Sequence, residues 1–576
     1  MTHETLILDQ PVPVDPPVAP GPHGPIDLPV APDSTVALDQ PVALVAEPVK
    51  HENPATLERP ELAGQRVLVV GLGESGLAMA QWAAFGGATV TVVDTRNDPP
   101  HRQTLIDRVP QAIFAGGGLA LETIERLMPE GIDRVAWSQG LSPTRGEAAE
   151  LHAALTARGV PIWGELDFFA VEIARLRAAG RACTVLAITG TNGKTTTTQL
   201  VGHLCEAAGL STRMAGNISP AALQVLYEAI QADDLPKVWV LELASFQLAL
   251  SSQFEADASA ILNLTEDHLD WHDDMAAYRA AKQKIHAGRS LCIVNRDDPA
   301  SRPDRITMEP LPGAPVPRKA APLPARPMVS FGLDLPRQAP GFGVQTDGGL
   351  DWLVEAVADD TPVRRSRSTA ATPAQAPGAE IRLRRLMPAD ALRLRGAHNR
   401  SNALAALALA QAAGVPMAAM LRALASFEAG AHRCTTIACI DGVDYVDDSK
   451  GTNVGATVAA LLGSPQPVIL IAGGDGKGQD FSPLLPAVSR AAKAVLLIGR
   501  DASRLHEALA PSGVPIERCD TLQSAVQRAA QMAQPGQAVL LSPACASLDM
   551  FRNYVHRAEV FIDAVRELAH DRGQPC

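Results

Sequence analysis

The 576-residue sequence predicts an α/β protein in which three domains each contain a mainly parallel sheet. Short apolar runs alternate with helical patterns along most of the chain, as in α/β proteins. Two of these runs, ending at Val70 and Thr189, lead into glycine turns that open helices, as in nucleotide-binding sheets. Further strand and helix patterns after residue 440 predict the third sheet. The length also suits about three to four domains.

The composition limits the possible partners and cellular location. A net charge of −13 argues against a general nucleic-acid binder, which would need a basic face. The eight cysteines are scattered without a C-x-x-C pair, which predicts neither a metal cluster nor a disulfide framework. No run of 18 apolar residues suggests a membrane span. We therefore expect a cytoplasmic monomer with no membrane or nucleic-acid partner.

Three stretches are predicted to lie outside the packed domains. Residues 1–60 contain 13 prolines, nine acidic residues, two basic residues and no aromatic residue, which predicts a disordered extension. A dense proline run at about 299–327 and an Arg-rich, Ser-rich run at about 360–380 predict inserted loops around a small β element.

The N-terminal domain, residues 61–178, carries a glycine fingerprint. The strand 66–70 precedes G-x-G-x-x-G at Gly71–Gly76, and Asp94 ends the next strand about 20 residues on. This pattern is typical of dinucleotide binding, but it also fits another nucleotide or a structural turn. Arg96 and a separate phosphate loop downstream favour a diphosphate ligand other than NAD. An NAD-dependent oxidoreductase remains the alternative from a different class.

The central domain, residues 179–390, opens with the clearest motif in the chain. Gly190–Thr196 reads G-x-x-G-K-T-T between an apolar strand and a helical pattern. Backbone N–H groups in such a turn can face phosphates, and the helix N-terminus adds positive potential. Lys194 would neutralise the β and γ oxygens, and the Thr195 hydroxyl suits a magnesium ligand. An ordinary strand–turn–helix would not require the lysine, so we predict a nucleoside triphosphate site.

Three further side chains of this domain are candidates for the same site. Glu242 ends an apolar strand, where a magnesium-binding acid belongs beside a phosphate loop, although a lone strand-end Glu is often structural. His268 lies in the acid-rich turn 265–270, where a surface histidine and a second metal position are about equally plausible. By spacing alone, Lys282 on a predicted helix would be a solvated lysine.

The C-terminal domain, residues 391–576, is predicted to begin with an Ala-rich helix and to contain a Rossmann-like sheet. Strands are expected at 444–446, 468–472, 494–498 and 538–541, each followed by a polar or glycine turn. Ligands bind at such carboxyl-end loops in α/β sheets. The cations Arg433, Lys450 and Lys477 are predicted to face the nucleotide.

Together these motifs resemble the ATP-dependent Mur ligases of peptidoglycan synthesis, over about 61–298 and 391–570. The resemblance rests on the phosphate loop and on the segments 242–247, 263–268, 398–402, 432–433 and 448–450. Several of these motifs also occur in folylpolyglutamate synthases. The segments 71–76, 94–96, 473–477 and 542–549 resemble the branch of the family that adds D-glutamate to UDP-N-acetylmuramoyl-L-alanine. Another Mur ligase or a folate-type amide ligase remains the alternative.

The resemblance implies a reaction, its cofactors and its site residues. A carboxylate is activated by the γ-phosphate of ATP, and the amino acid nitrogen then attacks the acyl phosphate. Catalytic roles fall to Lys194, Glu242, His268 and Lys282. Two magnesium sites are implied, with Thr195, Glu242, His268 and Lys282 as ligands, the last as a carboxylated lysine (carbamate).

Ligand contacts are implied residue by residue. ATP would be held by Gly190, Thr191, Asn192, Gly193, Lys194, Thr195, Thr196, Asn399, Asn402, Arg433, Asp448 and Lys450. The uridine nucleotide substrate would be held by Glu74, Ser75, Asp94, Thr95, Arg96, Ser138 and Asn217. The incoming D-glutamate would be held by Thr452, Lys477, Ser547 and Tyr554. Gln139 stands where the family has Pro, and Tyr554 where it has Phe.

Overall fold

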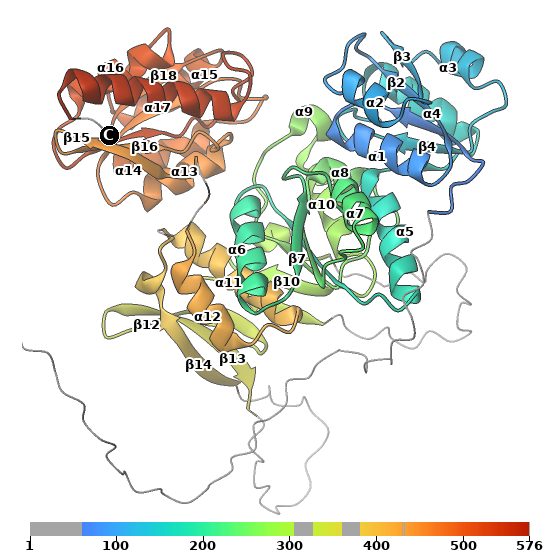
Figure 1. The fold of residues 1–576 in the computed structure, drawn as a ribbon. Coiled ribbons are helices and arrows are strands. Elements are labelled where there is room, and N and C mark those ends of the chain that lie inside the picture. The colour runs from blue at the N-terminus through green and yellow to red at the C-terminus, as the bar shows by residue number, and fades with distance from the viewer. Residues whose placement is uncertain are drawn as a thin grey trace, which may run out of the picture. The chain divides into compact units, whose positions relative to one another are not determined.

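The computed structural model of the protein describes residues 60–304, 327–359, 381–394, 396–428, 430 and 432–574, all within one compact unit, Val49–Cys576. Nearly all of the predicted extension 1–60 and most of the loops predicted at 299–327 and 360–380 lie outside the described residues. The described residues form three separate sheets with helices between their strands (Figure 1). The predicted α/β class with three mainly parallel sheets is therefore confirmed.

The N-terminal sheet is fully parallel, with the order β3-β2-β1-β4-β5. Its strands are β1 (Arg66–Val70), β2 (Thr89–Asp94), β3 (Ile113–Gly116), β4 (Arg134–Trp137) and β5 (Ile162–Trp163). Its helices are α1 (Glu74–Phe85), α2 (Arg102–Arg108), α3 (Leu121–Leu127), α4 (Gly146–Ala157) and α5 (Glu165–Ala178). The strand order reverses between β1 and β4, so the loops after these two strands flank the crevice where such sheets bind ligands.

The glycines of the first loop are required by close packing. A Cβ on Gly76 would lie 1.9 Å from the main-chain oxygen of Gly71, so only glycine lets α1 start this close to β1. Gly71 has φ +89°, in the left-handed region that favours glycine. The fingerprint therefore shapes the β1–α1 turn, as predicted from the sequence.

The central sheet has nine strands in the order β14-β13-β12-β11-β10-β9-β6-β8-β7. Its parallel part contains β6 (Thr184–Thr189), β7 (Thr212–Gly216), β8 (Val238–Glu242), β9 (Ala258–Ile261), β10 (Leu291–Asn295), β11 (Met328–Phe331) and β12 (Gly341–Asp347). The antiparallel strands β13 (Leu350–Ala358) and β14 (Ile381–Pro388) extend it. The small β element expected among the inserted loops is thus part of the main sheet.

The central helices are α6 (Lys194–Ala207), α7 (Ala222–Gln231), α8 (Ser245–Leu250), α9 (Leu269–His272) and α10 (Met275–Gln283). Short 3-10 helices follow at η1 (Lys284–His286), η2 (Pro299–Ser301) and η3 (Ala389–Ala391). Because β6 lies between β8 and β9, the loops after these three strands meet at one edge of the sheet. The predicted phosphate loop, Glu242 and His268 follow these three strands.

The structure differs from the predicted domain boundary at residue 391. Two helices follow that residue, α11 (Ala397–Ala412) and α12 (Met417–Ser426), and both pack against α6 (Figure 1). Their buried residues, such as Leu407 and Leu424, share a hydrophobic cluster with Ile188 and Ile293 of the central sheet. An Ala-rich helix can pack on either neighbouring sheet, and the sequence pattern alone does not distinguish the two.

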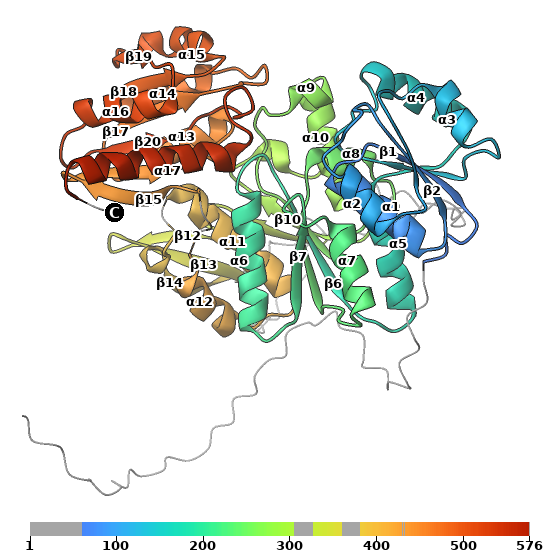
Figure 2. The same ribbon diagram turned by 45° about the horizontal axis from the view of Figure 1, so that its top comes forward.

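The C-terminal sheet has the order β15-β16-β20-β17-β18-β19. Its strands are β15 (Thr435–Ile440), β16 (Val443–Asp447), β17 (Val468–Gly473), β18 (Ala492–Ile498), β19 (Ile516–Arg518) and β20 (Ala538–Leu541). Its helices are α13 (Val454–Gly463), α14 (Leu485–Ala491), α15 (Ala502–Leu509), α16 (Leu522–Met532) and α17 (Tyr554–Asp571), with 3-10 helices η4 (Ser482–Leu484) and η5 (Ala510–Ser512). Helix α17 packs beside α16 along this sheet (Figure 2). All strands but β15 run parallel to their neighbours.

Buried apolar side chains cover both faces of the three sheets. Val69 and Leu68 of β1, for example, belong to clusters on opposite faces of the N-terminal sheet. One cluster continues from α1 and α5 into the central domain through α7. Among the described residues, no helix is both long enough and apolar enough to cross a membrane.

Candidate functional site

The phosphate loop has the backbone geometry that its sequence predicts. Strand β6 ends at Thr189, and α6 begins at Lys194 with Gly193 as its N-cap at φ +82°. A Cβ on Gly193 would lie 2.5 Å from Asn402 Oδ1, so glycine is required by both conformation and space. The N-terminus of α6 therefore opens onto the loop, as anion binding requires.

The ammonium group of Lys194 lies over this loop. Its Nζ donates to the main-chain oxygens of Gly190 at 2.9 Å and Thr191 at 2.8 Å. Burial lowers the pKa of Lys194, and the carboxylates of Glu242 and Asp267 oppose that shift. Lys194 thus lies at the end of α6 where bound phosphate would concentrate negative charge.

Glu242 lies at the end of β8 beside the loop and is 2% exposed. Asn217, which follows β7, donates its side-chain Nδ2 to Glu242 Oε1 at 2.9 Å. The other carboxylate oxygen, Oε2, is buried and has no hydrogen-bond partner among the described residues. A buried oxygen without a donor is costly, which makes Oε2 a candidate metal ligand.

His268 caps α9 in the left-handed region, at φ +56°, and its ring packs edge-on against Phe246 with centroids 4.6 Å apart. Burial lowers the pKa of His268 to about 3, so the ring is neutral at physiological pH. Its Nε2 lies 3.5 Å from Asp267 Oδ2. A neutral imidazole can offer a nitrogen lone pair to a metal ion.

Lys282 is a buried residue, 1% exposed, and not the solvated lysine that spacing alone suggests. Its Nζ donates to Thr189 Oγ1 and to the main-chain oxygen of Gly190, both at 3.0 Å. Burial and the neighbouring Lys194 hold the pKa of Lys282 well below its usual value. The structure therefore places this amine against the phosphate loop, in surroundings that favour its neutral form.

Five predicted contacts of the ATP site come from the chain after residue 391: Asn399, Asn402, Arg433, Asp448 and Lys450. Asn402 on α11 lies beside Gly193 and donates to Asn399 Oδ1 at 3.3 Å. At the end of β16, Asp448 Oδ2 accepts a hydrogen bond from Ser542 Oγ at 2.7 Å, and burial raises the pKa of Asp448 to about 7. Burial lowers the pKa of Lys450 to about 8.

Hydrogen bonds connect the loops of the C-terminal sheet to loops of the central sheet. Asn453 Nδ2 donates to Asn192 Oδ1 at 3.0 Å and to Asp267 Oδ2 at 3.4 Å. Lys477, with φ +52°, brings its Nζ to 3.4 Å from Asp267 Oδ1. These contacts bring the predicted D-glutamate lysine next to the loop that contains His268.

In the N-terminal domain, Asp94 has both carboxylate oxygens engaged. Oδ2 accepts from Leu72 N at 2.6 Å, and Arg96 donates from its main chain to Oδ1 and from its guanidinium to both oxygens. In NAD-binding proteins this acid hydrogen-bonds the ribose hydroxyl. The pairing with Arg96 instead presents a cation beside the glycine loop, which suits a phosphate-bearing ligand.

The remaining predicted substrate residues lie around the same crevice. Ser75, at the start of α1, is 4% exposed, and Ser138 follows β4 next to Gly71. Glu74 Oε1 accepts from Ser219 Oγ at 2.7 Å and from Ala221 N at 3.1 Å, which joins this loop to the β7–α7 loop. Thr95 is exposed at the end of β2.

The structure also places the other predicted D-glutamate residues. Ser547 is buried in the loop after β20, and Thr452 donates its main-chain N–H to Lys450 O at 3.0 Å. The ring of Tyr554, the first residue of α17, lies 5.3 Å from Lys450 Nζ. Tyr554 therefore also contacts a residue predicted to bind ATP.

Sequence reasoning missed several residues that organise this site. Asn453 hydrogen-bonds from the C-terminal sheet to Asn192 of the central sheet. It directly follows the predicted residue Thr452, so the run of polar residues after β16 could have indicated it. Arg557 contacts a predicted site loop from a position 108 residues away, and no local pattern marks it.

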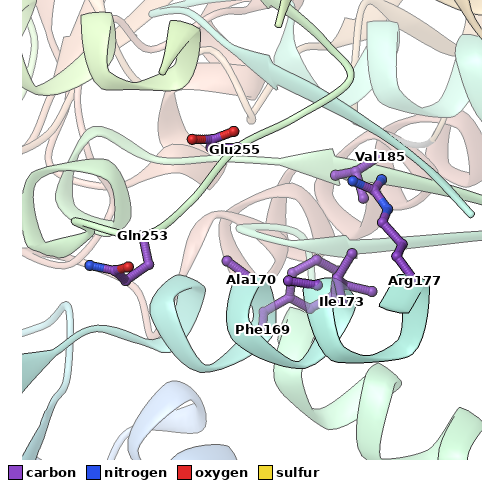
Figure 3. Close-up of a pocket in the computed structure, with 8 residues that line it drawn as sticks. Phe169, Ala170, Ile173, Arg177, Val185, Gln253 and Glu255 are labelled. Carbon is purple, nitrogen blue, oxygen red and sulfur yellow. The ribbon is translucent and has the colours of Figure 1, made fainter. Parts of the chain in front are cut away.

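A separate pocket of about 240 Å³ lies in the central domain (Figure 3). It is lined by α5 residues, including Phe169, Ile173 and Arg177, with Val185, Gln253 and Glu255. Val185 is near the amino end of β6, whereas the phosphate loop follows the carboxyl end of that strand. The pocket is therefore not part of the site described above. Within the described residues, no group of three or more His, Cys, Asp or Glu side chains could hold a metal ion.

The fold and the site together define an enzyme of the phosphate-loop type, with a glycine-rich turn beside a crevice on one sheet and polar loops on the two others. Three family models match the chain: the MurD-like N-terminal domain of Mur ligases at 65–162, the Mur ligase middle domain at 188–309, and the Mur ligase glutamate ligase domain at 432–545. The chain therefore belongs to the Mur ligase family, which joins amino acids by ATP-dependent amide bond formation.

Curated relatives agree with this assignment. UDP-N-acetylmuramoylalanine–D-glutamate ligase of Burkholderia thailandensis is 53% identical over 513 residues, which cover 88% of this chain and 98% of the relative. The enzyme of the same name from Burkholderia mallei matches to the same extent. Among solved structures, MurC from Thermotoga maritima matches at 16% identity with a TM-score of 0.47, covering 88% of this chain and 100% of that one.

Proposed function

We propose that the protein joins D-glutamate to UDP-N-acetylmuramoyl-L-alanine and converts ATP to ADP and phosphate, as a step of peptidoglycan precursor synthesis. The observation that carries the proposal is 53% identity across 98% of the length of relatives named for this activity. The site supplies matching chemistry: a phosphate loop, a buried carboxylate and a buried amine converge at one sheet edge.

The reaction suits what these residues can do. A carboxylate oxygen of the uridine substrate attacks the γ-phosphorus, and the bond from that phosphorus to ADP breaks. The D-glutamate nitrogen then forms an amide bond with the activated carbon, phosphate leaves, and a proton is lost. Both steps bring anions together, so they depend on positioning and charge neutralisation. Lys194 is placed to neutralise the transferred phosphate.

Magnesium fits the donors around the phosphate loop. We propose that Thr195 and Glu242 hold one ion and that His268 and Lys282 contribute to a second. Two observations support this proposal. Glu242 Oε2 has no hydrogen-bond partner among the described residues, and the ring of His268 is neutral, so each can offer a lone pair to a metal ion. Bound magnesium would screen the phosphate charges.

We also propose that Lys282 is carboxylated. An ammonium group would repel magnesium, but a neutral amine can attack CO₂ and lose a proton to give a carbamate. The low pKa of Lys282 favours the reactive neutral amine. A carbamate on Lys282 would supply further oxygen ligands beside His268.

We propose that loops of all three sheets contact the substrates. The N-terminal crevice would hold the uridine nucleotide through Glu74, Ser75, Asp94, Thr95, Arg96 and Ser138. Asn217 of the central domain would also contact this substrate. ATP would contact the phosphate loop, Asn399, Asn402, Arg433, Asp448 and Lys450. D-Glutamate would contact Thr452, Lys477, Ser547 and Tyr554. Because all substrates are soluble metabolites, we propose a cytoplasmic enzyme acting as a monomer.

The test is phosphate release from ATP with purified protein, measured over a matrix of acceptors and amino acids. We expect release only with UDP-N-acetylmuramoyl-L-alanine and D-glutamate together. Faster release with an L-amino acid, with diaminopimelate or with a folate acceptor would assign the chain to another ligase. Tight NAD binding without ATP turnover would instead support the oxidoreductase alternative.

A further inference from the structure

Arg557 lies on the first turn of α17 and has no assigned role in the reaction. Its side chain is 0% exposed, which is rare for an arginine. Burial lowers its pKa to about 10, so the guanidinium remains charged at neutral pH. Burying a charge is unfavourable unless its hydrogen bonds are satisfied, so its partners indicate what the residue is for.

The guanidinium of Arg557 donates to three acceptor atoms, which belong to two loops of the predicted site. Nη2 donates to Ser449 O at 2.8 Å and Nε to Ser449 Oγ at 3.0 Å. Nη1 donates to Cys545 O at 3.1 Å. Ser449 lies between Asp448 and Lys450 in the nucleotide loop, and Cys545 lies two residues before Ser547 in the D-glutamate loop. One rigid, planar group thus holds both loops.

A further hydrogen bond connects the nucleotide loop to the main chain of α17. Ser449 Oγ, which accepts from Arg557, donates in turn to Tyr554 O at 2.8 Å. The nucleotide loop is therefore tied to α17 at two points. Strands β16 and β20, which precede the two loops, are direct neighbours in the sheet. A change in the guanidinium position would shift both loops together.

We propose that Arg557 is a positioning residue that sets the nucleotide loop 447–450 and the D-glutamate loop 542–547 in register with each other. It touches neither substrate and acts through Ser449 and Cys545. The inference rests on the proposed function, because it takes Lys450 as an ATP contact and Ser547 as a D-glutamate contact.

The position predicts an unusual kinetic pattern. Arg557→Lys keeps the charge, but a single ammonium nitrogen cannot reproduce the three-point fork. We expect the KM values for ATP and for D-glutamate to rise together, each about tenfold. The KM for the uridine substrate should stay unchanged, because Arg557 makes no hydrogen bond to the described residues of the N-terminal domain.

The matched control is Phe561→Leu, one helical turn further along α17. Phe561 is also 0% exposed, but it packs in the core cluster with Leu541, and its side chain cannot hydrogen-bond to either loop. This variant should lower Tm and leave all three KM values unchanged. If Arg557→Lys behaves in the same way, the residue is merely structural and the inference is wrong. A rise in only one of the two KM values would also overturn it.

Further variants separate this inference from the proposed function. Lys450→Met should raise the KM for ATP, and Ser547→Ala should raise the KM for D-glutamate. If neither changes, the proposed roles of the two loops fail. If both change while Arg557→Lys has no effect, the inference alone fails. Should Arg557→Lys not fold, Ser449→Ala removes one guanidinium acceptor and should raise the same two KM values by a smaller factor; unchanged values would overturn the inference.

Discussion

The main-chain oxygen of Gly190 accepts hydrogen bonds from two lysines, from Lys194 Nζ at 2.9 Å and from Lys282 Nζ at 3.0 Å. Two ammonium groups this close would repel each other, and the pKa of Lys282 is depressed by burial and by Lys194. Burial lowers the pKa of both lysines. The depressed pKa of Lys282 favours its neutral amine, and its Nζ donates to Thr189 and Gly190.

Lys194 should be essential for turnover but not for folding. Lys194→Met removes the cation that neutralises the transferred phosphate, so we expect ATP-dependent phosphate release to fall below about one hundredth of wild type. The control is Lys284→Met, because Lys284 also donates to two main-chain oxygens, those of Ala249 and Ser251. The control should lower Tm and keep its turnover. Near-normal turnover in folded Lys194→Met would contradict the nucleotide assignment.

Glu242 should set the magnesium requirement. Glu242→Gln keeps the size of the side chain and an acceptor for Asn217, but loses the charge on Oε2. We expect the magnesium concentration for half-maximal turnover to rise roughly tenfold or more. Glu172→Gln is the matched control, since Glu172 is also buried but pairs with Arg175 on α5. An unchanged magnesium titration in Glu242→Gln would argue that Oε2 binds no metal.

Lys477 should contribute to the binding of D-glutamate. Its ammonium group lies near Asp267, and a D-glutamate carboxylate could take over that contact. Loss of a charged hydrogen bond costs about 1.5–3 kcal/mol, so Lys477→Ala should raise the KM for D-glutamate roughly ten- to a hundredfold. The KM for ATP should remain close to wild type. The exposed Lys493 of β18 provides a control variant, Lys493→Ala, and equal effects in the two variants would refute the assignment.

The titration of Asp448 should make the free energy of unfolding depend on pH. Its folded pKa of about 7 lies above the ordinary value near 3.9 in unfolded chains. Between these two pKa values the folded state binds more protons than the unfolded state. The contribution of Asp448 to the free energy of unfolding is therefore highest below about pH 4 and falls as the pH rises through 7. The loss amounts to at most about 4 kcal/mol. Without ligands, Asp448→Asn should raise Tm relative to wild type more at pH 8 than at pH 5. Equal differences at both values would disprove this.

Local motifs made much of the fold and site predictable. The phosphate loop and the β1–α1 fingerprint are recognisable because their glycines meet requirements set within a few residues, as Gly76 and Gly193 illustrate. Most strands after residue 440 were also found, since buried parallel strands are continuous apolar runs. Strands β15 and β19 were missed because β15 is mostly exposed and β19 has only three residues.

What could not be predicted depends on contacts between distant parts of the chain. Arg557 and Ser449 are 108 residues apart, and an arginine in an amphipathic helix normally indicates a solvated face. The depressed pKa of Lys282 likewise follows from its burial, and its Nζ contacts Thr189 and Gly190, more than 90 residues earlier. The Ala-rich α11 gave no indication of which sheet it covers, because small side chains suit either one.

Lys282 provides the sharpest test of the metal site, because two readings of it predict opposite results. As a plain cation, Lys282 would neutralise phosphate, and Lys282→Arg would retain much of the turnover. As a carbamate it presents oxygen ligands to magnesium, and arginine forms no equivalent stable carbamate. We expect Lys282→Arg to be nearly as inactive as Lys282→Ala, with ATP still bound through Lys194.

The wild-type enzyme should depend on CO₂ for the same reason. Rigorous removal of bicarbonate should abolish phosphate release, and its addition should restore it, whereas Lys282→Ala should not respond. The depressed pKa of Lys282 favours this modification, because carboxylation requires the neutral amine and an exposed lysine would be almost fully protonated near pH 7. Substantial turnover by Lys282→Arg, or full activity without bicarbonate, would mean that Lys282 acts as an amine or a cation and that magnesium takes its ligands elsewhere.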